Sequence, residues 1–377
     1  MASVAQAGST DQARDRARAV RLPSLDLLRG LTVAGMIVVN ATAALNYVAG
    51  PVFPVLLHAR WAGFTAADAV FPAFITMVGV SIAISARPDA PLSARRIAWR
   101  ALRLILLGLV LVNLYLPFSP DPWPPRLPGV LQRIAIVYAI SALVYPRTSW
   151  RWRSVAAATI LALYALLCLL PVPGGVPTDL WEPGQNLASW LDRQVFGDWM
   201  GEKGPLGYDP EGLLSTLPAL AQAFIGTIAG DLLRSKLSVS RRSQGLAAAG
   251  VVGIAAAMLL DPVIPIAKPI WTTSFVFLSA GITLIGLALF HRVFDGRDHG
   301  MRKGGLLGSF GRNAITAYAL HYVIINFVMS APLRAPMKWL APIVGNETAA
   351  LAPVAIFLAI LWLPLAIMDR RGWYVKI

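Results

Sequence analysis

The sequence has a single cysteine, Cys168, and only four histidines among its 377 residues. One cysteine cannot form a disulfide within the chain or a metal site made of several thiolates. Charged residues are scarce as well, at 14% of the chain, whereas an average soluble domain carries about 25%. Acidic residues are fewer than basic ones, with 19 Asp and Glu against 33 Lys and Arg. These absences exclude a disulfide-stapled domain, argue against a soluble one, and lead us to predict no metal site.

Long apolar segments make up much of the chain. Hydrophobic residues make up 56% of the chain, and ten stretches approach or exceed the ~17–25 mostly apolar residues that cross a bilayer as a helix. They lie at residues 24–45, 66–85, 99–117, 129–145, 153–171, 212–234, 244–261, 271–290, 311–330 and 349–368. Lipid offers the backbone no hydrogen-bond partners, so such segments span as helices. The sequence therefore predicts an all-α, polytopic membrane bundle of about ten transmembrane helices.

Lys and Arg are distributed unevenly between the two ends of these spans. If the N-terminus is cytoplasmic, 25 of the 33 fall in cytoplasmic segments and 8 fall on the other side. Cytoplasmic loops of membrane proteins carry such an excess, which predicts cytoplasmic termini and a multi-pass protein of the inner (plasma) membrane. The net charge of +14 then reflects topology and contact with anionic lipid headgroups, and we expect no nucleic-acid partner.

The tail and the loops predict a simple organisation. Residues 1–22 contain many Ala, Arg and Asp and no apolar run, which predicts a disordered cytoplasmic tail. The first apolar segment lacks a small-residue cleavage site, so we expect an anchor and not a signal peptide. Residues 23–371 then form one transmembrane domain with a long periplasmic loop, 172–211, which is acidic and contains three Trp. This loop packs on the membrane surface, forms an interfacial lid, or helps to bind a sugar by stacking; the sequence leaves these three choices open.

His58 lies at the mouth of the first helix pair, and no capping or dipole rule accounts for it. Ionisable groups at the hydrocarbon boundary are costly and therefore indicate function. An imidazole titrates near neutral pH and can act as an acid, a base or a nucleophile. We expect His291, among basic residues, to be solvated, and His321, on an apolar and aromatic segment, to pack or to support the site.

Two polar residues near His58 have both a structural and a functional interpretation. Thr65 to Asp68 fits a helix capping box, with Thr65 at the N-cap and Asp68 at the third helical position. Asp68 also follows His58 closely enough to act with it. Asn40, near the far end of the first span, is either a contact between helices or a donor in the active site. The sequence alone leaves both choices open.

Further polar positions open other spans. Asp26 and Arg29 can pair within the first helix, or Arg29 can face an anionic cofactor on the cytoplasmic side. Arg133 follows Gln132 at the outer boundary and requires a carboxylate or carbonyl partner, which the long loop can provide. Asp209-Pro210-Glu211 fits an N-cap, a proline at the first helical position and an acidic residue in the first turn.

These residues, in this order, resemble the heparan-α-glucosaminide N-acetyltransferase family and its bacterial relatives. The resemblance rests on the whole series, which covers about residues 22–371, because no single motif is specific. The series comprises Ser24-Leu25-Asp26-x-x-Arg29-Gly30, Asn40, His58-Ala59-x-Trp61-x-Gly63-x-Thr65-x-x-Asp68-x-x-Phe71-Pro72, Gly129-Val130-Leu131-Gln132-Arg133-Ile134, Asp209-Pro210-Glu211-Gly212-Leu213-Leu214-Ser215-Thr216, Trp271-Thr272-Thr273-Ser274-Phe275 and Gly311-x-Asn313-Ala314.

The resemblance implies an enzyme that takes an acetyl group from cytoplasmic acetyl-CoA and delivers it to an amino sugar, or a related glycan, across the membrane. The active-site histidine of the family falls on His58, and its preceding asparagine falls on Asn40. Animal members have a large extracytoplasmic N-terminal domain that this chain lacks, and Ala41-Thr42-Ala43 replaces the usual glycines. The segment between Asn40 and His58 is also longer here than in the animal members. These departures bear on the acceptor more than on the reaction.

We therefore expect three groups of site residues. Guanidinium groups bind phosphates by charge-assisted hydrogen bonds, an amide can stabilise a developing oxyanion, and His58 can act as a base or form a transient acetyl-imidazole. The expected catalytic residues are His58, Asn40 and Asp68; the expected CoA contacts are Arg29, Arg96, Arg100 and Arg103; the expected acceptor contacts are Trp61, Gln132, Arg133 and Glu211.

Two other functions fit some of these features. A secondary transporter of a sugar or similar solute would use His58 and Asp68 as a proton relay, although no convincing internal repeat supports an inverted-repeat transporter. A non-catalytic scaffold or flippase-like partner would use the same polar positions to lock helices together. A homodimer is compatible with the sequence, which does not reveal the oligomeric state.

Overall fold

The computed structural model describes residues 22–87, 92–118, 124–295 and 303–375; the predicted tail at residues 1–22 lies outside this part of the chain except for Leu22. Within it the architecture is helical, with two isolated β-bridges, Ala62–Ala267 and Glu202–Tyr208. The helices are α2 (Pro23–Ala49), α3 (Val70–Ser85), α4 (Ala94–Val112), α5 (Val130–Val144), α6 (Trp150–Cys168), α7 (Leu187–Phe196), α8 (Thr216–Arg234), α9 (Val239–Leu260), α10 (Thr273–Phe294), α11 (Leu306–Arg312), α12 (Ala314–Ile324), α13 (Ala331–Val344), α14 (Asn346–Ala349) and α15 (Leu351–Arg371).

The predicted all-α, polytopic fold is confirmed. Nine helical segments in the described residues are long and apolar enough to cross a membrane, and the bent pair Ala314–Met329 and Ala331–Val344 makes a tenth if it is one span. The two halves of this pair meet at 57°. The predicted span 311–330 covers only the first half, because prolines and basic residues interrupt the apolar pattern of α13.

Short polar side chains determine where several membrane helices begin. Ser93, Ser149, Ser238 and Thr272 precede α4, α6, α9 and α10, and each side chain accepts a hydrogen bond from a backbone N–H in the first turn. Such N-caps satisfy one of the amides that a helix leaves without an internal partner. Three of these four N-caps precede helices whose first turns carry arginines. The polar cap and the basic residues therefore lie together at the start of each of these helices.

Glycines allow the helices around the centre to approach closely. A Cβ at Gly79 of α3 would lie 2.0 Å from the carbonyl oxygen of Ala223 in α8, and one at Gly226 would lie 2.1 Å from that of Thr76. Gly30 of α2 similarly faces the backbone of α11. Small residues permit such backbone contact between membrane helices, where burial from water provides no driving force. These contacts fix α2, α3 and α8, which carry or adjoin the site described below.

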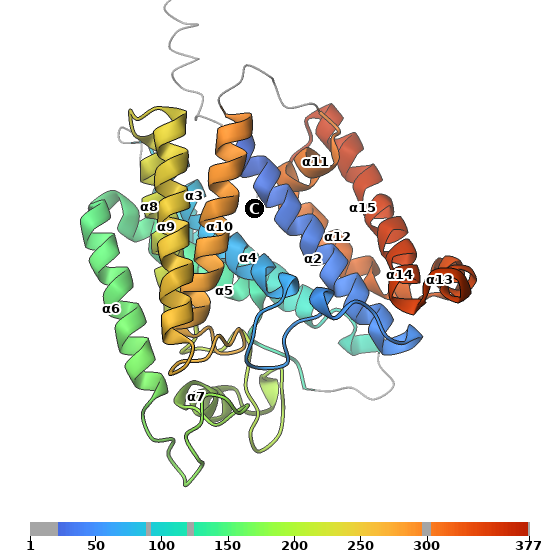
Figure 1. Ribbon diagram of the computed structural model, residues 1–377, viewed down its shortest axis with the longest axis horizontal. Helices are drawn as coiled ribbons and strands as arrows, with labels where there is room; N and C mark the ends of the chain where they lie inside the picture. Colours follow the sequence, from blue (N-terminus) through green and yellow to red (C-terminus); the bar gives the residue numbers. More distant parts are fainter. Residues whose placement is uncertain (1–21, 88–91, 119–123, 296–302, 376–377) are drawn as a thin grey trace, which may run out of the picture.

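The helices form two groups with α2 between them (Figure 1). The first group contains α6, α8, α9 and α10, and the second contains α11 to α15. The helix α3 packs on α8, α9 packs on α10, and α4 packs on α5. The segment with α7 lies at one end of the bundle, and the start of α2 lies at the other (Figure 1).

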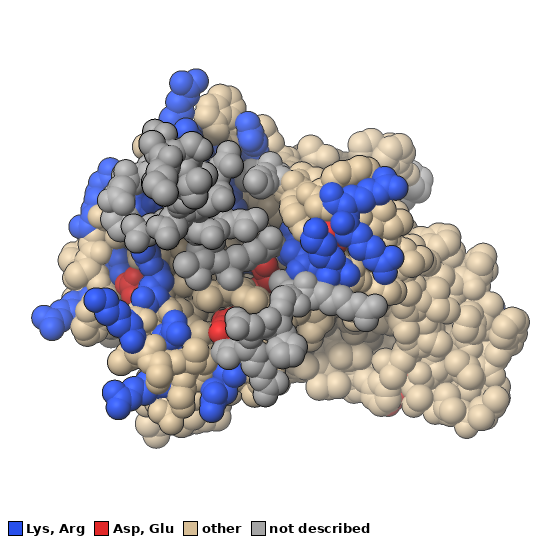
Figure 2. Space-filling model, turned by 90° about the horizontal axis from the view of Figure 1, so that it is seen from above, with Lys and Arg blue, Asp and Glu red and all other residues tan. Residues whose placement is uncertain are grey.

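Basic side chains gather on the face opposite α7. Figure 2 shows this face, where Lys and Arg are spread over the helix ends and few acidic residues are visible. Exposed residues here include Arg234, Lys236, Arg241, Arg370 and Arg371. This is the face that the sequence assigns to the cytoplasm, and its charge is of the kind that anionic headgroups attract.

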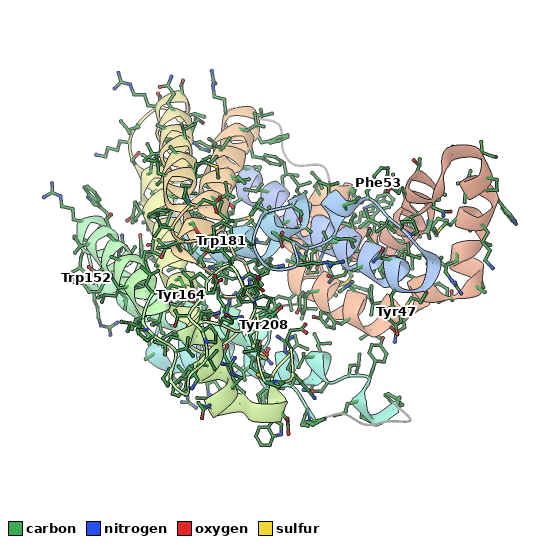
Figure 3. All side chains as sticks on the ribbon, turned by 60° about the horizontal axis from the view of Figure 1, so that its bottom comes forward. Tyr47, Phe53, Trp152, Tyr164, Trp181 and Tyr208 are labelled. Carbon is green, nitrogen blue, oxygen red and sulfur yellow. The ribbon has the colours of Figure 1, made fainter. Side chains whose placement is uncertain are left out.

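The long loop between α6 and α8 folds against the end of the bundle. Figure 3 shows it from its own side, with Trp181 and Tyr208 labelled. The Asp192 carboxylate, which is buried, accepts a hydrogen bond of 2.9 Å from the Leu213 backbone N–H. Burial raises the pKa of Asp192 to about 6. A carboxyl group therefore holds this loop to the segment that leads into α8.

Candidate active site

A cavity of about 820 Å³ extends through the centre of the bundle. Its walls come from α2, α3, α4, α5 and α12, together with the loops that follow α2 and α9. This volume is within the range of about 300–1,000 Å³ typical of ligand sites. The polar residues that line it include Arg29, Asn40, His58, Ser81, Ser85, Arg87, Arg96, Arg100, Tyr138, Tyr145, Glu211, Lys268, Arg312, Tyr318 and Tyr322.

The two ends of this cavity differ in their side chains. Arg29 lies near the start of α2, and Arg96 and Arg100 lie near the start of α4. His58 lies beyond the other end of α2, and Lys268 lies in the loop after α9. The wall between them is mostly apolar and includes Met36, Phe74, Val78, Leu104 and Ile134. The cavity therefore joins a basic end to an end that contains a histidine.

His58 is paired with a buried carboxylate. Its Nδ1 lies 2.8 Å from Oδ1 of Asp68, whose side chain is 0% exposed, while 43% of the His58 side chain is exposed. A carboxylate accepts a proton and cannot donate one when ionised, so this contact favours hydrogen on Nδ1. The Nε2 atom then carries the lone pair. This is the arrangement by which a carboxylate orients a histidine as a base or nucleophile.

Asp68 also fulfils the structural role that the sequence suggested. Its Oδ2 accepts hydrogen bonds of 3.1 Å from the backbone N–H groups of Ala59 and Thr65 and from the Thr65 hydroxyl. The Thr65 backbone contact is one half of the predicted capping box. The two interpretations of Asp68 are therefore compatible, because Oδ2 organises the loop while Oδ1 contacts His58.

The loop that carries His58 is fixed to the loop that follows α9. The Gly63 N–H donates to the Ile266 carbonyl at 2.8 Å, and Ala62 and Ala267 form a β-bridge. Gly63 has φ of +110°, a conformation that glycine adopts readily and other residues rarely adopt. This contact brings two segments that are about 200 residues apart in the sequence to the same place.

Lys268 completes this end of the cavity. Its Nζ lies 2.8 Å from Nδ1 and 3.1 Å from Nε2 of His58, and 3.5 Å from Oδ1 of Asp68. Only 16% of the Lys268 side chain is exposed. Burial lowers the pKa of the Lys268 ammonium, an effect that Asp68 and Glu211 oppose. The histidine is thus in contact with one anionic and one basic side chain.

Hydrogen bonds hold the Lys268 loop in one conformation. The Thr272 hydroxyl donates to the Pro265 carbonyl at 2.8 Å and accepts from the Ala267 N–H at 3.0 Å. Trp271 has φ of 53°, which is unusual for a residue with a side chain. Its fully buried indole N–H donates to Gln222 at 2.9 Å. The predicted motif at residues 271–275 therefore shapes the turn that presents Lys268.

Asn40 and His321 contact each other across the bundle. The Asn40 amide Nδ2 lies 3.3 Å from Nε2 of His321, and Asn40 lines the cavity. His321 is buried, in agreement with the expectation that it packs or supports the site. The expectation for His291 is wrong: it is 1% exposed, and its Nδ1 lies 2.6 Å from Asp295, which also accepts from the Ser24 N–H.

Glu211 belongs to an ion-pair cluster beside the cavity. Nη2 of Arg126 lies 2.5 Å from Glu211 and 2.6 Å from Asp209, and Nε of Arg126 lies 3.1 Å from Asp209. These contacts outweigh burial and raise the pKa of the Arg126 guanidinium. Glu211 lines the cavity and Asp209 does not. The predicted N-cap at Asp209 is wrong, because α8 begins at Thr216. The Asp209-Pro210-Glu211 motif instead places the Glu211 carboxylate on the cavity wall at the histidine end.

Three expected acceptor contacts lie outside the cavity lining, in the surrounding structure. Trp61 donates to the Leu180 carbonyl at 2.9 Å and packs on Tyr208. Arg133 is buried; it donates to the Gly212 carbonyl at 3.1 Å and to the Ser215 hydroxyl, and it stacks on Trp271. The predicted carbonyl partner is present for Arg133. The Gln132 amide donates to the Leu127 carbonyl at 3.0 Å.

At the basic end, three of the four arginines expected to bind CoA line the cavity, and Arg103 does not. Arg29 donates to Ser81 at 2.8 Å and lies 3.2 Å from Asp26, so the predicted pair is present and Arg29 still lines the cavity. Arg100 lies over the Tyr138 ring, 4.6 Å from its centre. The cavity thus presents several guanidinium groups on one side.

Lys268, Tyr318 and Tyr322 line the cavity but were not among the expected site residues. Lys268 had a detectable signal, because it is one of the few basic residues on the predicted outer side and lies three residues before Trp271. The two tyrosines gave no such signal in the sequence, because aromatic residues are common in apolar helices. Their rings lie 5.0 Å apart on α12.

Comparison with known proteins confirms the resemblance that the motif series indicated. Residues 21–181 match the family described as heparan-alpha-glucosaminide N-acetyltransferase, catalytic, and this region includes Asn40, His58 and Asp68. The human heparan-alpha-glucosaminide N-acetyltransferase is 28% identical over 377 residues, which cover 85% of this chain and 54% of the human protein. The mouse protein of the same name is 28% identical over 381 residues, 86% of this chain and 56% of the relative. The chain spans about half the length of these curated relatives.

Proposed function

We propose that this chain is a transmembrane acetyltransferase, with residues 23–371 as its acyltransferase domain. It takes an acetyl group from acetyl-CoA on the cytoplasmic side and transfers it to the amino group of an amino sugar, of the glucosamine type or in a related glycan, on the extracytoplasmic side. One observation carries the proposal: a single cavity has arginines at one end and the His58–Asp68 pair at the other.

The proposed orientation places the basic face of the bundle in the cytoplasm of a cell with this protein in its inner membrane. Lys and Arg gather on that face (Figure 2), while the segment with α7 lies at the opposite end. The positive-inside tendency supports this assignment. The arginine end of the cavity then opens toward the side where acetyl-CoA is made, and His58 faces the acceptor.

The arginines are suited to hold the phosphates of CoA. Arg29, Arg96 and Arg100 come from two helices and line one end of the cavity. Guanidinium groups form paired, charge-assisted hydrogen bonds with phosphate oxygens. The mostly apolar middle of the cavity suits the extended arm that carries the thioester. These properties would place the acetyl group near His58.

His58 and Asp68 are suited to the transfer itself. With hydrogen held on Nδ1 by Asp68, the Nε2 atom can remove a proton from the attacking amine or attack the thioester to form an acetyl-imidazole. Both routes use the same atom and the same orientation. Asn40, on the same cavity, can donate to the carbonyl oxygen as negative charge develops there.

The acceptor would bind at the histidine end. Glu211, Tyr318 and Tyr322 line the cavity there and offer a carboxylate, hydroxyl groups and aromatic faces. A carboxylate favours the ammonium form of an amino sugar, and aromatic rings stack on the apolar face of a sugar ring. The glucosaminide in the names of the human and mouse relatives supports this class of acceptor.

Purified protein in detergent tests this function. With acetyl-CoA and glucosamine, the wild-type protein should release CoA thiol and form N-acetylglucosamine in equal amounts. The His58→Ala variant, shown to be folded by its elution as a single species in gel filtration, should form neither product. Trp339→Ala on the exposed surface of α13 provides a matched control that should retain full turnover.

The same assay separates the enzyme from a transporter. A proton-coupled transporter would need a gradient and would leave acetyl-CoA intact in detergent. Consumption of acetyl-CoA that depends on both His58 and the amine supports the proposal. Wild-type protein that is folded and consumes no acetyl-CoA with glucosamine or other amino sugars would contradict it.

A further inference from the structure

We propose that Lys268 is a second proton acceptor in the reacting centre, which removes a proton from the ammonium group of the acceptor before attack. This inference deepens the function proposed above and rests on it. The evidence is the position of Lys268, which contacts both nitrogens of the His58 ring and lines the same cavity. A basic side chain placed there is within reach of an amine that binds beside His58.

The overall reaction gives a second base beside His58 a defined task. An amine on a carbon skeleton is largely protonated near neutral pH, and an ammonium nitrogen has no lone pair with which to attack. Conversion of this ammonium to an amide removes two protons from nitrogen. One proton ends on the sulfur of CoA, and one is released to water. A single imidazole that must serve the second transfer cannot also hold the first proton.

The proposed sequence balances these protons. In its neutral form, Lys268 takes a proton from the acceptor ammonium, and the freed amine attacks the acetyl carbonyl, forming a C–N bond. The C–S bond breaks, the second nitrogen proton passes through His58 Nε2 to the thiolate, and Lys268 then releases its proton to extracytoplasmic water. If the acetyl group is first carried by His58, the C–S bond breaks earlier, when Nε2 attacks the thioester and the thiolate leaves. The amine then attacks the acetyl-imidazole, the C–N(imidazole) bond breaks, and the freed Nε2 takes the second nitrogen proton and passes it to the thiolate. The role of Lys268 is unchanged.

The surroundings of Lys268 favour this role. Lysines that act as general bases are buried, because desolvation disfavours the charged ammonium. Burial lowers the pKa of Lys268, and the groups that oppose this effect come from other segments: Asp68 from the turn before α3, and Glu211 from the segment before α8. His58, Tyr318 and Tyr322 also line this cavity. A lysine in this setting exchanges its proton more readily than a solvated one.

A purely structural ion pair explains the geometry less well. Asp68 already accepts hydrogen bonds from Ala59 and Thr65 and contacts His58. The distance from Lys268 Nζ to Asp68 is 3.5 Å, longer than its 2.8 Å and 3.1 Å distances to the imidazole. Lys268 therefore contacts the imidazole more closely than the carboxylate, so the ion pair with Asp68 does not account for its whole position.

Two acceptors and two variants test this inference. Glucosamine arrives largely protonated at pH 7, whereas O-methylhydroxylamine is a weakly basic amine that arrives neutral and needs no first deprotonation. Lys268→Met should lose roughly 10²–10⁴-fold in turnover with glucosamine, as is typical when a general base is lost. With O-methylhydroxylamine, after subtraction of the rate without enzyme, the same variant should lose less than about tenfold. Turnover of Lys268→Met with glucosamine should also recover toward wild type as pH rises, because more of the amine is then neutral.

Lys268→Arg separates proton transfer from charge. Arginine keeps the positive charge but does not give up its proton, so this variant should be as defective with glucosamine as Lys268→Met. Lys203→Met, a change of the same kind at an exposed site outside the cavity lining, should behave as wild type with both acceptors. If Lys268→Met does not fold, the arginine variant and its pH profile carry the test.

Three results would overturn the inference. The first is near-normal turnover of Lys268→Arg with glucosamine. The second is an equal loss of turnover for Lys268→Met with both acceptors. The third is turnover of the folded variants with glucosamine that does not recover at higher pH. Each would assign Lys268 to charge or structure alone while leaving acetyl transfer intact. Wild-type protein that transfers acetyl to neither amine would instead contradict the proposed function.

Discussion

The two ends of the central cavity are built in different ways. At the histidine end, loops that are distant in sequence are held together by backbone hydrogen bonds, and Asp68, His58 and Lys268 contact one another within 3.5 Å. At the basic end, Arg96 and Arg100 project from the exposed first turns of α4. One end is held in a defined geometry, and the other concentrates charge.

This difference corresponds to two physical tasks. A proton transfer or an attack on a carbonyl tolerates little displacement, so its groups need support from the surrounding structure. Attraction of phosphates depends on charge at a wider range of distances and on side chains that adapt to the ligand. We therefore expect substitutions at the histidine end to affect kcat and those at the basic end to affect KM.

The largest effect should follow from loss of His58. His58→Ala should reduce turnover by at least roughly 10²–10⁴-fold, because the base or nucleophile is removed, while acetyl-CoA binding measured by calorimetry stays nearly unchanged. Incubation of wild type with radiolabelled acetyl-CoA and no acceptor separates the two routes, since label retained on wild type and absent from His58→Ala indicates a covalent intermediate. Near-normal turnover of His58→Ala would show that His58 is not a catalytic residue.

A smaller loss should follow from removal of the proposed oxyanion donor. Asn40→Ala should reduce kcat by roughly 10²–10³-fold, the range for one such donor. His321→Ala should cost less, roughly tenfold, because its contact with Asn40 at 3.3 Å only positions the amide. Steady-state kinetics of both variants check this order. An equal or larger loss for His321→Ala would show that His321, and not Asn40, acts in the transfer.

At the basic end the effect should appear in KM and should be smaller. Arg29→Ala and Arg100→Ala should raise the KM for acetyl-CoA roughly tenfold, in line with loss of one charge-assisted hydrogen bond. The KM for a dephospho analogue should rise less if these residues contact the removed phosphate. Arg103→Ala, on the same helix but outside the cavity lining, is the matched control. Equal changes for all three variants would assign these arginines to topology alone.

The prediction furthest from the chemistry concerns the stability of the long loop. The pKa of Asp192 is raised in the folded protein from 3.8 to about 6, so its contribution to stability is fully present below pH 3.8 and is lost as pH rises through 6. The loss amounts to roughly 3 kcal/mol at most. In Asp192→Asn this dependence should disappear, and the Tm of the variant relative to wild type should rise between pH 5 and pH 7. Parallel Tm curves would contradict the shift.

The sequence predicted the parts of this molecule that depend on local patterns. Apolar runs located the helices, and the ordered motifs identified Asn40, His58 and Asp68, two of which are in direct contact. The pairing of Lys268 with His58 was not predicted, because it depends on the β-bridge between Ala62 and Ala267. Contacts between segments about 200 residues apart leave no periodic signal in a single sequence.

The same limit explains the residues that were expected in the cavity but lie outside its lining. Trp61 and Arg133 belong to the motifs, yet their side chains support the loops around the site. A motif marks residues that the site needs, and the sequence does not distinguish those that face a ligand from those that hold its walls. The short α13 was missed for a different reason, since its prolines and basic residues interrupt the apolar pattern.

The central claim is that one cavity carries the acetyl group from a donor on the basic face to an acceptor on the other face. Vesicles that contain the protein with its basic face outward test it directly, with acetyl-CoA outside and glucosamine trapped inside. The account predicts N-acetylglucosamine inside and CoA thiol outside in equal amounts, and neither product with His58→Ala. Product that forms only when both substrates share one side, or intact acetyl-CoA that appears inside, would contradict it.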